Sequence, residues 1–494
     1  MSLSLARLLP GHHLPPELAG REIAGLTLDS RRVRPGDAFV AVPGISVDGR
    51  DYIEDAIRAG AGAVLAEENE SGVQMHGGIP VIAMPELSRN LGHLAARFHG
   101  NPGANMQVLG VTGTNGKSST AWFLRDALEA DGVSCALIGT LGLFHGGSHR
   151  ETVHTTPDAL ALHAALAEFR DAGARAVVME VSSHALDQDR LQAVPMTVAV
   201  FTNLTHEHLD YHQDMESYYR AKARLFHRPG LELAVLNLDD DAGRRLAGEL
   251  SPGLPCLGYS GTDRPDADVV ASGFRATPQG MEASVHAGKQ TLSLRLPLYG
   301  SFNLNNVLAV AAVLHGLGRD ARAMARALNA ITPVPGRMEP VPASAHAPRV
   351  LVDYAHTPDA LEHALQAARA HFRGALWCVV GCGGERDRDK RPLMAAVAER
   401  GADRVVLTSD NPRGEPPEGI LEEMKKGLAR PEQAVVCVDR RQAVEKAVRD
   451  AAPEDVVLIA GKGHERWQEV AGTRHPMDDR ELARTALGQR EGCA

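Results

Sequence analysis

The stretch Val108-Leu-Gly-Val-Thr-Gly-Thr-Asn-Gly-Lys-Ser-Ser119 decides how the middle of this 494-residue chain folds. A mostly apolar strand leads into a glycine-rich turn, and Lys117 and Ser118 open a helix. Backbone N–H groups in such a turn and at the helix N-terminus bind phosphate oxygens. We expect Lys117 to neutralise phosphate charge and Ser118 to ligate Mg²⁺. Val111 departs from the strict P-loop pattern, so a tight strand–helix turn with a surface lysine is the plain alternative.

Other apolar runs alternate with helical stretches on both sides of this turn. Runs that are apolar throughout are typical of parallel strands covered on both faces. They lie at 38–42, 63–66, 80–84, 107–111, 135–138, 176–181, 198–201 and 234–236, and again at 350–352, 375–380, 404–407, 434–438 and 456–460. Residues 291–296 alternate with period two, which predicts an antiparallel insertion, and a helix is expected at 303–315.

Two punctuated segments divide the chain. Phe98-His-Gly-Asn-Pro-Gly103 and Pro333-Val-Pro-Gly336 are rich in residues that end helices and strands. They predict three α/β domains at 1–96, 97–335 and 336–494, the central one with a P-loop ATPase-like parallel sheet. Ligands should bind at the carboxyl ends of the parallel strands.

Composition narrows the class of protein. Lys and Arg total 52 against 62 Asp and Glu, a formal net charge of −10, so nucleic acid is a poor partner. Six cysteines without a CxxC motif form no disulfide framework, which predicts a reducing, cytoplasmic compartment. We expect neither a membrane span nor a signal peptide, because no long apolar window occurs and Arg7 and Pro10 interrupt the N-terminal one.

Polar groups end two of the predicted strands. Glu180 follows four apolar residues, and a carboxylate at a strand end beside a phosphate loop suits a Mg²⁺ ligand. His206, His208 and His212 cluster after the next strand. They lack the HExxH spacing and a nearby cysteine, so a zinc site is the less favoured alternative to a role around a Mg-nucleotide.

With further motifs in the same order, these residues resemble the Mur ligases, ATP-dependent amide-forming enzymes of bacterial cell-wall synthesis. The resemblance is carried by Gly110-Val-Thr-Gly-Thr-Asn-Gly-Lys-Ser118, Glu180-Val-Ser-Ser-His184, Asn203-Leu-Thr205, His208-Leu-Asp210, Gly300-Ser-Phe-Asn303, Pro335-Gly-Arg337-Met-Glu339 and Asp353-Tyr-Ala-His356. Thr27-Leu-Asp-Ser-Arg31, His154-Thr-Thr-Pro157, Gly381-Cys-Gly-Gly-Glu-Arg-Asp387, Asp410-Asn-Pro-Arg413 and Gly461-Lys-Gly-His-Glu465 are most similar to members that add diaminopimelate. The family architecture implies a UDP-substrate-binding domain, a central ATP-binding domain and a C-terminal Rossmann-like domain that binds the amino acid.

The resemblance also implies a role for each matching residue. ATP would be held by Gly113, Thr114, Asn115, Gly116, Lys117, Ser118, Ser119, Asn303, Arg337 and Asp353. The UDP-muramoyl-dipeptide would contact Leu28, Ser30, Thr155, Thr156, Ser182, Gln188 and Arg190. Diaminopimelate would contact Arg386, Asp410, Asn411, Pro412, Arg413, Gly461 and Glu465. Magnesium would be held by Ser118, Glu180, His208 and a carbamate on Lys222, and the catalytic residues would be Lys117, Glu180, His208, Lys222 and Arg337.

The implied reaction is addition of meso-diaminopimelate to the D-glutamate of UDP-N-acetylmuramoyl-L-alanyl-D-glutamate, through an acyl phosphate. ATP is the co-substrate, Mg²⁺ the cofactor, and all partners are small molecules bound by a monomer. Arg413 would grip the additional carboxylate of diaminopimelate, although an ordinary loop arginine is the alternative. His208, His356 or solvent would accept the proton of the attacking amine.

Several points stay open at the level of sequence. Lys222, without the resemblance, is an ordinary solvated helix lysine. Residues 44–47 are less polar than the uridine-side loop of the family, which leaves their contacts open. Another amide ligase, such as a folylpolyglutamate synthase, or a non-catalytic nucleotide-binding switch are the competing functions.

Overall fold

The computed structural model describes residues 2–44, 47–344 and 346–492, so Ile45 and Ser46 of the predicted uridine-side loop lie outside the described residues. The chain divides into two compact units. The first comprises Met1–Ala121, Gly132–Leu236 and Asp240–Leu257, and the second Trp122–Asp131, Asn237–Asp239 and Gly258–Ala494. The three domain boundaries expected from the sequence stay a prediction, because the first unit holds both the N-terminal region and much of the central region.

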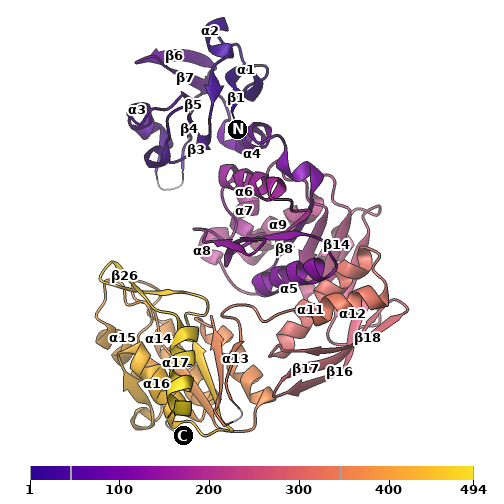
Figure 1. The fold of residues 1–494 in the computed structure, drawn as a ribbon, viewed down its shortest axis with the longest axis vertical. Coiled ribbons are helices and arrows are strands. Elements are labelled where there is room, and N and C mark those ends of the chain that lie inside the picture. The colour runs from indigo at the N-terminus through magenta and orange to yellow at the C-terminus, as the bar shows by residue number, and fades with distance from the viewer. Residues whose placement is uncertain (1, 45–46, 345, 493–494) are drawn as a thin grey trace. The chain divides into compact units, whose positions relative to one another are not determined.

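A small sheet forms the N-terminal part of the first unit (Figure 1). Its strands are, in spatial order, β3 (Leu26–Thr27), β4 (Ala38–Ala41), β5 (Ala63–Glu67), β7 (Ile79–Met84) and β6 (Gly72–His76). All neighbours are parallel except β6 with β7. Alternate residues of β4 and β5 pack into two different apolar clusters, one including α4 (Leu91–Phe98) and the other α3 (Ile53–Arg58). The three apolar runs expected here as strands are confirmed.

The second sheet of the first unit carries the glycine-rich turn. The first seven of its 11 strands are, in spatial order, β11 (Ser148–Arg150), β10 (Gly142–His145), β9 (Cys135–Gly139), β12 (Ala176–Glu180), β8 (Gln107–Thr112), β13 (Val198–Phe201) and β14 (Leu233–Asn237). Five neighbouring strands, β9, β12, β8, β13 and β14, run parallel to one another. Their residues are almost all buried, as their continuous apolar runs predict. Because β8 pairs with both β12 and β13, the loops after these three strands leave the sheet side by side.

Helices of the first unit follow these strands. They include α5 (Lys117–Ala130), which continues into the second unit, α6 (Ala159–Asp171), α7 (Ser183–Asp187), α8 (Leu209–His212), α9 (Met215–Ala223) and α10 (Asp241–Glu249). Side-chain oxygens cap α6, α7, α9 and α10, from Asp158, Ser182, Asp214 and Asp240 respectively. Such caps satisfy the first N–H groups of a helix, so they fix where each helix begins.

The second unit begins with the antiparallel insertion that the sequence predicts. Strands β16 (Val269–Thr277), β17 (Gly280–Ala287) and β18 (Gln290–Leu296) form consecutive hairpins. The period-two pattern is confirmed, because Leu292, Leu294 and Leu296 are buried while the residues between them are exposed. Strand β15 (Cys256–Ser260) joins β16 in parallel. Helices α11 (Ser301–Gly316) and α12 (Ala321–Asn329) follow, α11 over the expected range.

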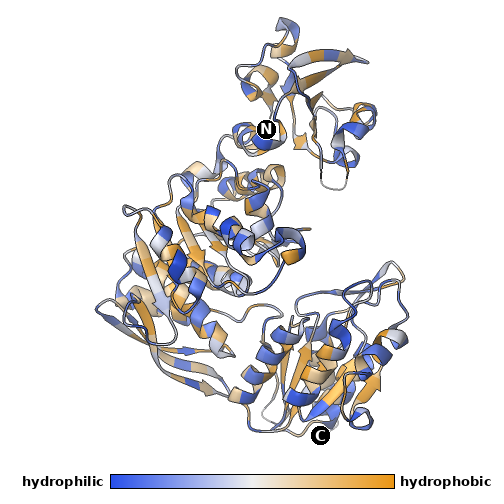
Figure 2. Ribbon diagram, turned by 180° about the vertical axis from the view of Figure 1, so that it is seen from behind, coloured by the Kyte–Doolittle hydropathy of each residue, from blue (hydrophilic) through white to orange (hydrophobic). Residues whose placement is uncertain are grey.

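The remainder of the second unit is a doubly wound sheet, as predicted. Its order is β19 (Glu339–Val341), β20 (Arg349–Asp353), β24 (Val456–Ala460), β21 (Leu376–Val380), β22 (Arg404–Thr408) and β23 (Val435–Cys437), with only β19 antiparallel. One face packs on α13 (Pro358–His371), α14 (Lys390–Gly401) and α15 (Pro417–Lys425), the other on α16 (Arg440–Asp450) and α17 (Asp479–Gly492). The strands are accordingly hydrophobic, whereas the helices carry one hydrophilic side (Figure 2). A short hairpin, β25 (Trp467–Val470) and β26 (Thr473–Pro476), precedes α17.

Candidate active site

The glycine-rich turn is held as an anion-binding loop between β8 and α5. Gly113 has a φ of 143°, and a β-carbon on it would collide with the hydroxyl of Thr202 on the neighbouring strand end. The N–H of Asn115 donates to the side-chain oxygen of Asn203 at 2.8 Å. Lys117 Nζ donates to the carbonyls of Gly113 and Thr114 at 3.0 and 2.7 Å, so it lies folded over the loop where phosphate charge would gather.

Glu180 lies directly beside this loop, as its position at the end of β12 predicts. Its Oε2 accepts a hydrogen bond from Ser118 Oγ at 2.8 Å, and its Oε1 accepts one from the N–H of Thr140 at 2.8 Å. Glu180 is only 2% exposed. A hydroxyl and a carboxylate at this spacing are oxygen donors of the kind Mg²⁺ prefers, so these two residues fit a magnesium site.

Lys222 is not a solvated helix lysine, which is a correction to its reading from sequence alone. It is 1% exposed on α9, and its Nζ donates to the carbonyl of Gly113 at 2.8 Å. Burial lowers the pKa of Lys222 well below its ordinary value, and the charge of Lys117 lowers it further. The surroundings of Lys222 therefore disfavour its charged form more than solvent does, next to the phosphate loop.

The histidine cluster packs against the same region. The rings of His184 and His208 meet edge to face at 5.1 Å, and His212 stacks on Tyr218 at 5.1 Å. Burial lowers the pKa of His208, the carboxylate of Glu207 opposes that shift, and the charge of Lys117 adds to it. Within the described residues, no three His, Cys, Asp or Glu side chains form a group that could hold a metal.

A hydrogen-bonded network joins the residues expected to hold the muramoyl-dipeptide. Thr156 Oγ1 donates to the carbonyl of Glu180 at 2.8 Å and accepts from the N–H of Ser182 at 3.1 Å. Arg190 donates to the carbonyl of Thr156 at 2.8 Å and to the side chain of Gln188 at 3.0 Å. Thr155 contacts Thr140, the residue that also binds Glu180, at 2.9 Å.

The two residues expected at the uridine end belong to the N-terminal sheet of the same unit. Leu28 packs against the apolar cluster around β4 and β5. Ser30 is 9% exposed and begins a short 3-10 helix, for which Asp29 accepts a hydrogen bond from the N–H of Arg31. Both residues lie in the segment that follows β3 in the sequence.

In the second unit, two of the three residues expected to hold the nucleotide, Arg337 and Asp353, lie near the end of β20. Asp353 accepts hydrogen bonds from the N–H groups of Met338 and Ala355 at 2.7 and 2.8 Å, and burial raises its pKa. The Arg337 guanidinium lies 4.6 Å over the ring of Tyr354. Among the described residues, the buried Nε of Arg337 has no hydrogen-bond partner, which leaves it a donor for an anion. Asn303, at the start of α11, is engaged internally with Tyr299 and Asn306.

The diaminopimelate motifs meet at the ends of β22 and β24. A β-carbon on Gly461 would lie within 2.7 Å of Asp410 Oδ2, so only glycine allows this close approach. Asn411 donates to Glu465 at 2.9 Å. Arg413 has a left-handed backbone, with a φ of 51°, and its Nη1 donates to the carbonyl of Gly384 at 2.7 Å. Pro412, between them, is buried, whereas Arg386 is exposed on the neighbouring loop.

Tyr354 connects the two sets of residues electrostatically. Burial raises its pKa, the carboxylates of Glu465 and Asp410 add to the rise, and the guanidinium groups of Arg337 and Arg386 oppose it. The charge of Arg337, which is expected to bind ATP, and the charges of Arg386, Asp410 and Glu465, which are expected to bind diaminopimelate, therefore all act on the ring of Tyr354.

Sequence reasoning missed several buried cations in this region, among them Lys462 and Arg391. Lys462 is 0% exposed, and its Nζ donates to Asn411 Oδ1 and Glu465 Oε2, both at 2.9 Å. Arg391, also 0% exposed, donates to Glu415, Glu423 and the carbonyl of Gly383. The burial of Lys462 could have been suspected from its position inside the motif 461–465. Nothing in the sequence around Arg391 distinguishes it from a solvent-exposed arginine on a helix.

Comparison with known families gives three consecutive matches along the chain. Residues 22–99 match the Mur ligase family catalytic domain, residues 111–314 the Mur ligase middle domain, and residues 336–463 the Mur ligase glutamate ligase domain. The match to the middle domain includes residues 113–119 of the phosphate loop. The match to the glutamate ligase domain includes the motif 410–413 and the first three residues of the motif 461–465.

Individual proteins are similar over nearly the whole length. A UDP-N-acetylmuramoyl-L-alanyl-D-glutamate–2,6-diaminopimelate ligase of Xanthomonas campestris is 48% identical over 491 residues, which is 99% of this chain and 98% of that protein. The protein of the same name from Coxiella burnetii is 46% identical over 94% of this chain and 96% of its own length. A solved structure with this name superposes with a TM-score of 0.72 at 33% identity, covering 99% of this chain and 100% of the other.

Proposed function

This chain belongs to the Mur ligase family, and we propose that it joins 2,6-diaminopimelate to UDP-N-acetylmuramoyl-L-alanyl-D-glutamate, using ATP, in peptidoglycan precursor synthesis. The observation that carries the proposal is the 48% identity to a ligase of that name over nearly all of both chains. The site supports it, because a phosphate loop and an Arg413 motif are two features that such a reaction needs.

The chemistry follows from the poor reactivity of a carboxylate. The side-chain carboxylate of D-glutamate attacks the γ-phosphorus of ATP, ADP leaves, and an acyl phosphate forms. A neutral amine of diaminopimelate then attacks the acyl carbon, orthophosphate leaves, and the amine loses a proton. Negative charge gathers in both steps, so Lys117 and Arg337 would stabilise the transition states electrostatically. His208, His356 or water would accept the proton.

Magnesium fits the first unit through Ser118 and Glu180, whose oxygens meet at 2.8 Å. Bound there, Mg²⁺ would screen the repulsion between the substrate carboxylate and the triphosphate. His208 would complete the set, and its lowered pKa favours the neutral imidazole, which is the form that can ligate a metal. Lys222 would contribute as a carbamate, formed when its neutral Nζ attacks carbon dioxide and loses a proton. Its burial against Gly113 supports that role.

The substrate subsites are assigned in the same way. ATP would lie along Gly113–Ser119 with Asn303, Arg337 and Asp353, the muramoyl-dipeptide on the Thr155–Thr156, Ser182, Gln188 and Arg190 network, and its uridine end near Leu28 and Ser30. Diaminopimelate would lie among Arg386, Asp410, Asn411, Pro412, Arg413, Gly461 and Glu465. The described part of the chain has no helix long and apolar enough to cross a membrane. We propose that the chain carries out this reaction as a monomer in the cytoplasm.

The test is a product analysis with a matched acceptor. Purified protein is incubated with ATP, Mg²⁺, the UDP-muramoyl-dipeptide and either meso-diaminopimelate or lysine, and orthophosphate and the ligated nucleotide are measured by colorimetry and mass spectrometry. We expect both products with diaminopimelate and far less with lysine, which lacks one carboxylate. No orthophosphate with any acceptor contradicts the ligase proposal, and turnover with lysine alone contradicts only the assigned acceptor.

A further inference from the structure

Arg440, the first residue of α16, is a buried arginine that the reaction described above does not use. Its side chain and that of Asp479 are both 0% exposed. A guanidinium is rarely buried completely, and the N-terminus of a helix is an unfavourable place for a cation. The two-pronged contact with Asp479, through Nε at 2.8 Å and Nη2 at 2.7 Å, neutralises this charge.

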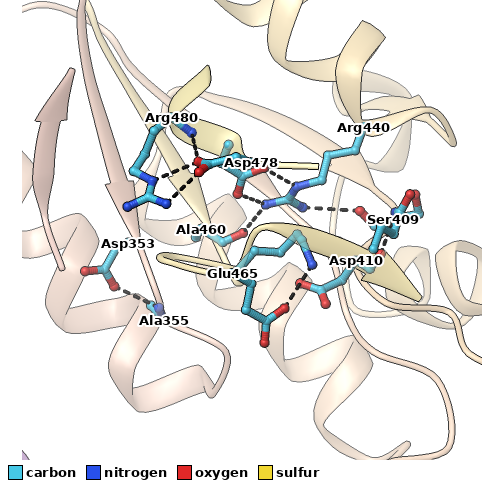
Figure 3. Close-up of polar contacts among 12 residues, drawn as sticks. Asp353, Ala355, Ser409, Asp410, Arg440, Ala460, Glu465, Asp478 and Arg480 are labelled. Atoms are coloured by element: carbon cyan, nitrogen blue, oxygen red, sulfur yellow. Dashed lines mark hydrogen bonds and ion pairs between the residues drawn. The ribbon is translucent and has the colours of Figure 1, made fainter. Parts of the chain in front are cut away.

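The remaining donors of Arg440 reach two other segments of the chain. Nη1 donates to the carbonyl of Ser409 at 3.2 Å, and Nη2 donates to the carbonyl of Ala460 at 2.9 Å (Figure 3). Ser409 directly precedes Asp410, and Ala460 directly precedes Gly461. One guanidinium therefore holds the starting points of both diaminopimelate motifs.

The sheet itself does not join these two points. Strands β22 and β24 are separated by β21, so no ladder hydrogen bond runs between them. The last pairs that β21 makes with them are Val380 with Leu407 and Val379 with Ile459. Thr408 still pairs with Cys437 on β23, and Ala460 still pairs with Asp353 on β20, so the two motifs begin just beyond the sheet. The relative position of the two motifs thus depends on groups that join them outside the ladder. Lys462 and Glu465 do so by direct hydrogen bonds with Asn411, and Arg440 does so at the residues that directly precede both motifs.

We propose that Arg440, oriented by Asp479, is a positioning residue that sets the two motifs 410–413 and 461–465 at the spacing needed to bind diaminopimelate. The inference rests on the proposed function for the identity of the ligand, but the geometry is independent of it. Lysine cannot replace arginine here, because one ammonium group cannot make the same planar set of donations to Asp479, Ser409 and Ala460.

The decisive variant is Arg440→Lys. It keeps a positive charge beside Asp479 but loses the planar guanidinium group, which donates to Asp479, Ser409 and Ala460 at once. The matched control is Val448→Ala, on the same helix and also 0% exposed, since it loosens the packing of α16 without touching either motif. For Arg440→Lys we expect a rise of about 10- to 100-fold in the KM for diaminopimelate, from misplaced binding groups, with the KM for ATP little changed. Val448→Ala should leave both KM values near those of the wild type.

Amide hydrogen exchange supplies a second readout that needs no substrate. Arg440→Lys should speed exchange in 409–413 and 460–465 together, beyond any change in Val448→Ala at equal loss of thermal stability. If the two variants exchange alike at these segments and the KM for diaminopimelate is unchanged, the positioning role is refuted. If the wild type releases no orthophosphate with diaminopimelate while the two segments still loosen together, the positioning role stands and the proposed function is the part that fails.

Discussion

Replacement of Arg413 tests the proposed acceptor site most directly. Its guanidinium donates to the carbonyl of Gly384 at 2.7 Å, and its Nε lies 3.8 Å from Glu469. These contacts hold the guanidinium in place before any ligand binds. A hydrogen bond to a charged group contributes about 1.5–3 kcal/mol. At about 1.4 kcal/mol per tenfold, Arg413→Ala should raise the KM for diaminopimelate about 10- to 100-fold.

The assay is orthophosphate release at saturating ATP and UDP-muramoyl-dipeptide, with diaminopimelate varied. Arg413→Lys is the matched variant, because lysine keeps the positive charge but not the two-pronged geometry, and alanine and lysine share the cost of the left-handed backbone at this position. We expect an intermediate KM for the lysine variant. An alanine variant that binds diaminopimelate as tightly as the wild type would refute the assignment of Arg413 to the acceptor carboxylate.

Three other perturbations probe separate parts of the chain. Lys117→Ala should lower kcat at least about 100-fold in the phosphate-release assay, since it removes a cation from the phosphate loop, and a smaller loss would contradict that role. Gly139→Ala should raise the Mg²⁺ concentration needed for half-maximal rate, because a β-carbon would collide with the Glu180 carboxylate, whereas Gly248→Ala, in open space, should not. Burial lowers the pKa of His99 from 6.5 to about 4, so its stabilising contribution is present above about pH 6.5 and lost as the pH falls towards 4. The melting temperature of the wild type should therefore fall more than that of His99→Gln over this interval, and equal falls would contradict the buried-neutral assignment.

Much of the fold was predictable because its elements depend on near neighbours in the chain. The apolar run of β8, the glycines after it and the start of α5 are all contained in residues 107–119. The period-two pattern of β18 likewise needs only its own residues. The position of Glu180 beside Ser118 was also foreseen, since parallel strands end at one edge of a sheet and both residues follow such strands.

Local sequence could not reveal which charged side chains are buried. Lys222 lies on a helix of ordinary polar composition, yet its Nζ donates a hydrogen bond to the carbonyl of Gly113, 109 residues earlier in the chain. The burial of Arg391 and Lys462 was not predicted from the sequence either. Burial of a charge depends on which distant groups surround it, and a single sequence contains no record of that.

The amino-acid sequence by itself determined the strand and helix order, the phosphate loop and the identity of the motifs, because each follows from backbone preferences and apolar spacing over about ten residues. Only the tertiary structure decided that Arg440 meets Asp479, 39 residues away, and spans from Ser409 to Ala460 across an intervening strand. Such a contact depends on where strands lie in space, since sheet order is not chain order, and a buried guanidinium is stable only where that order supplies enough acceptors.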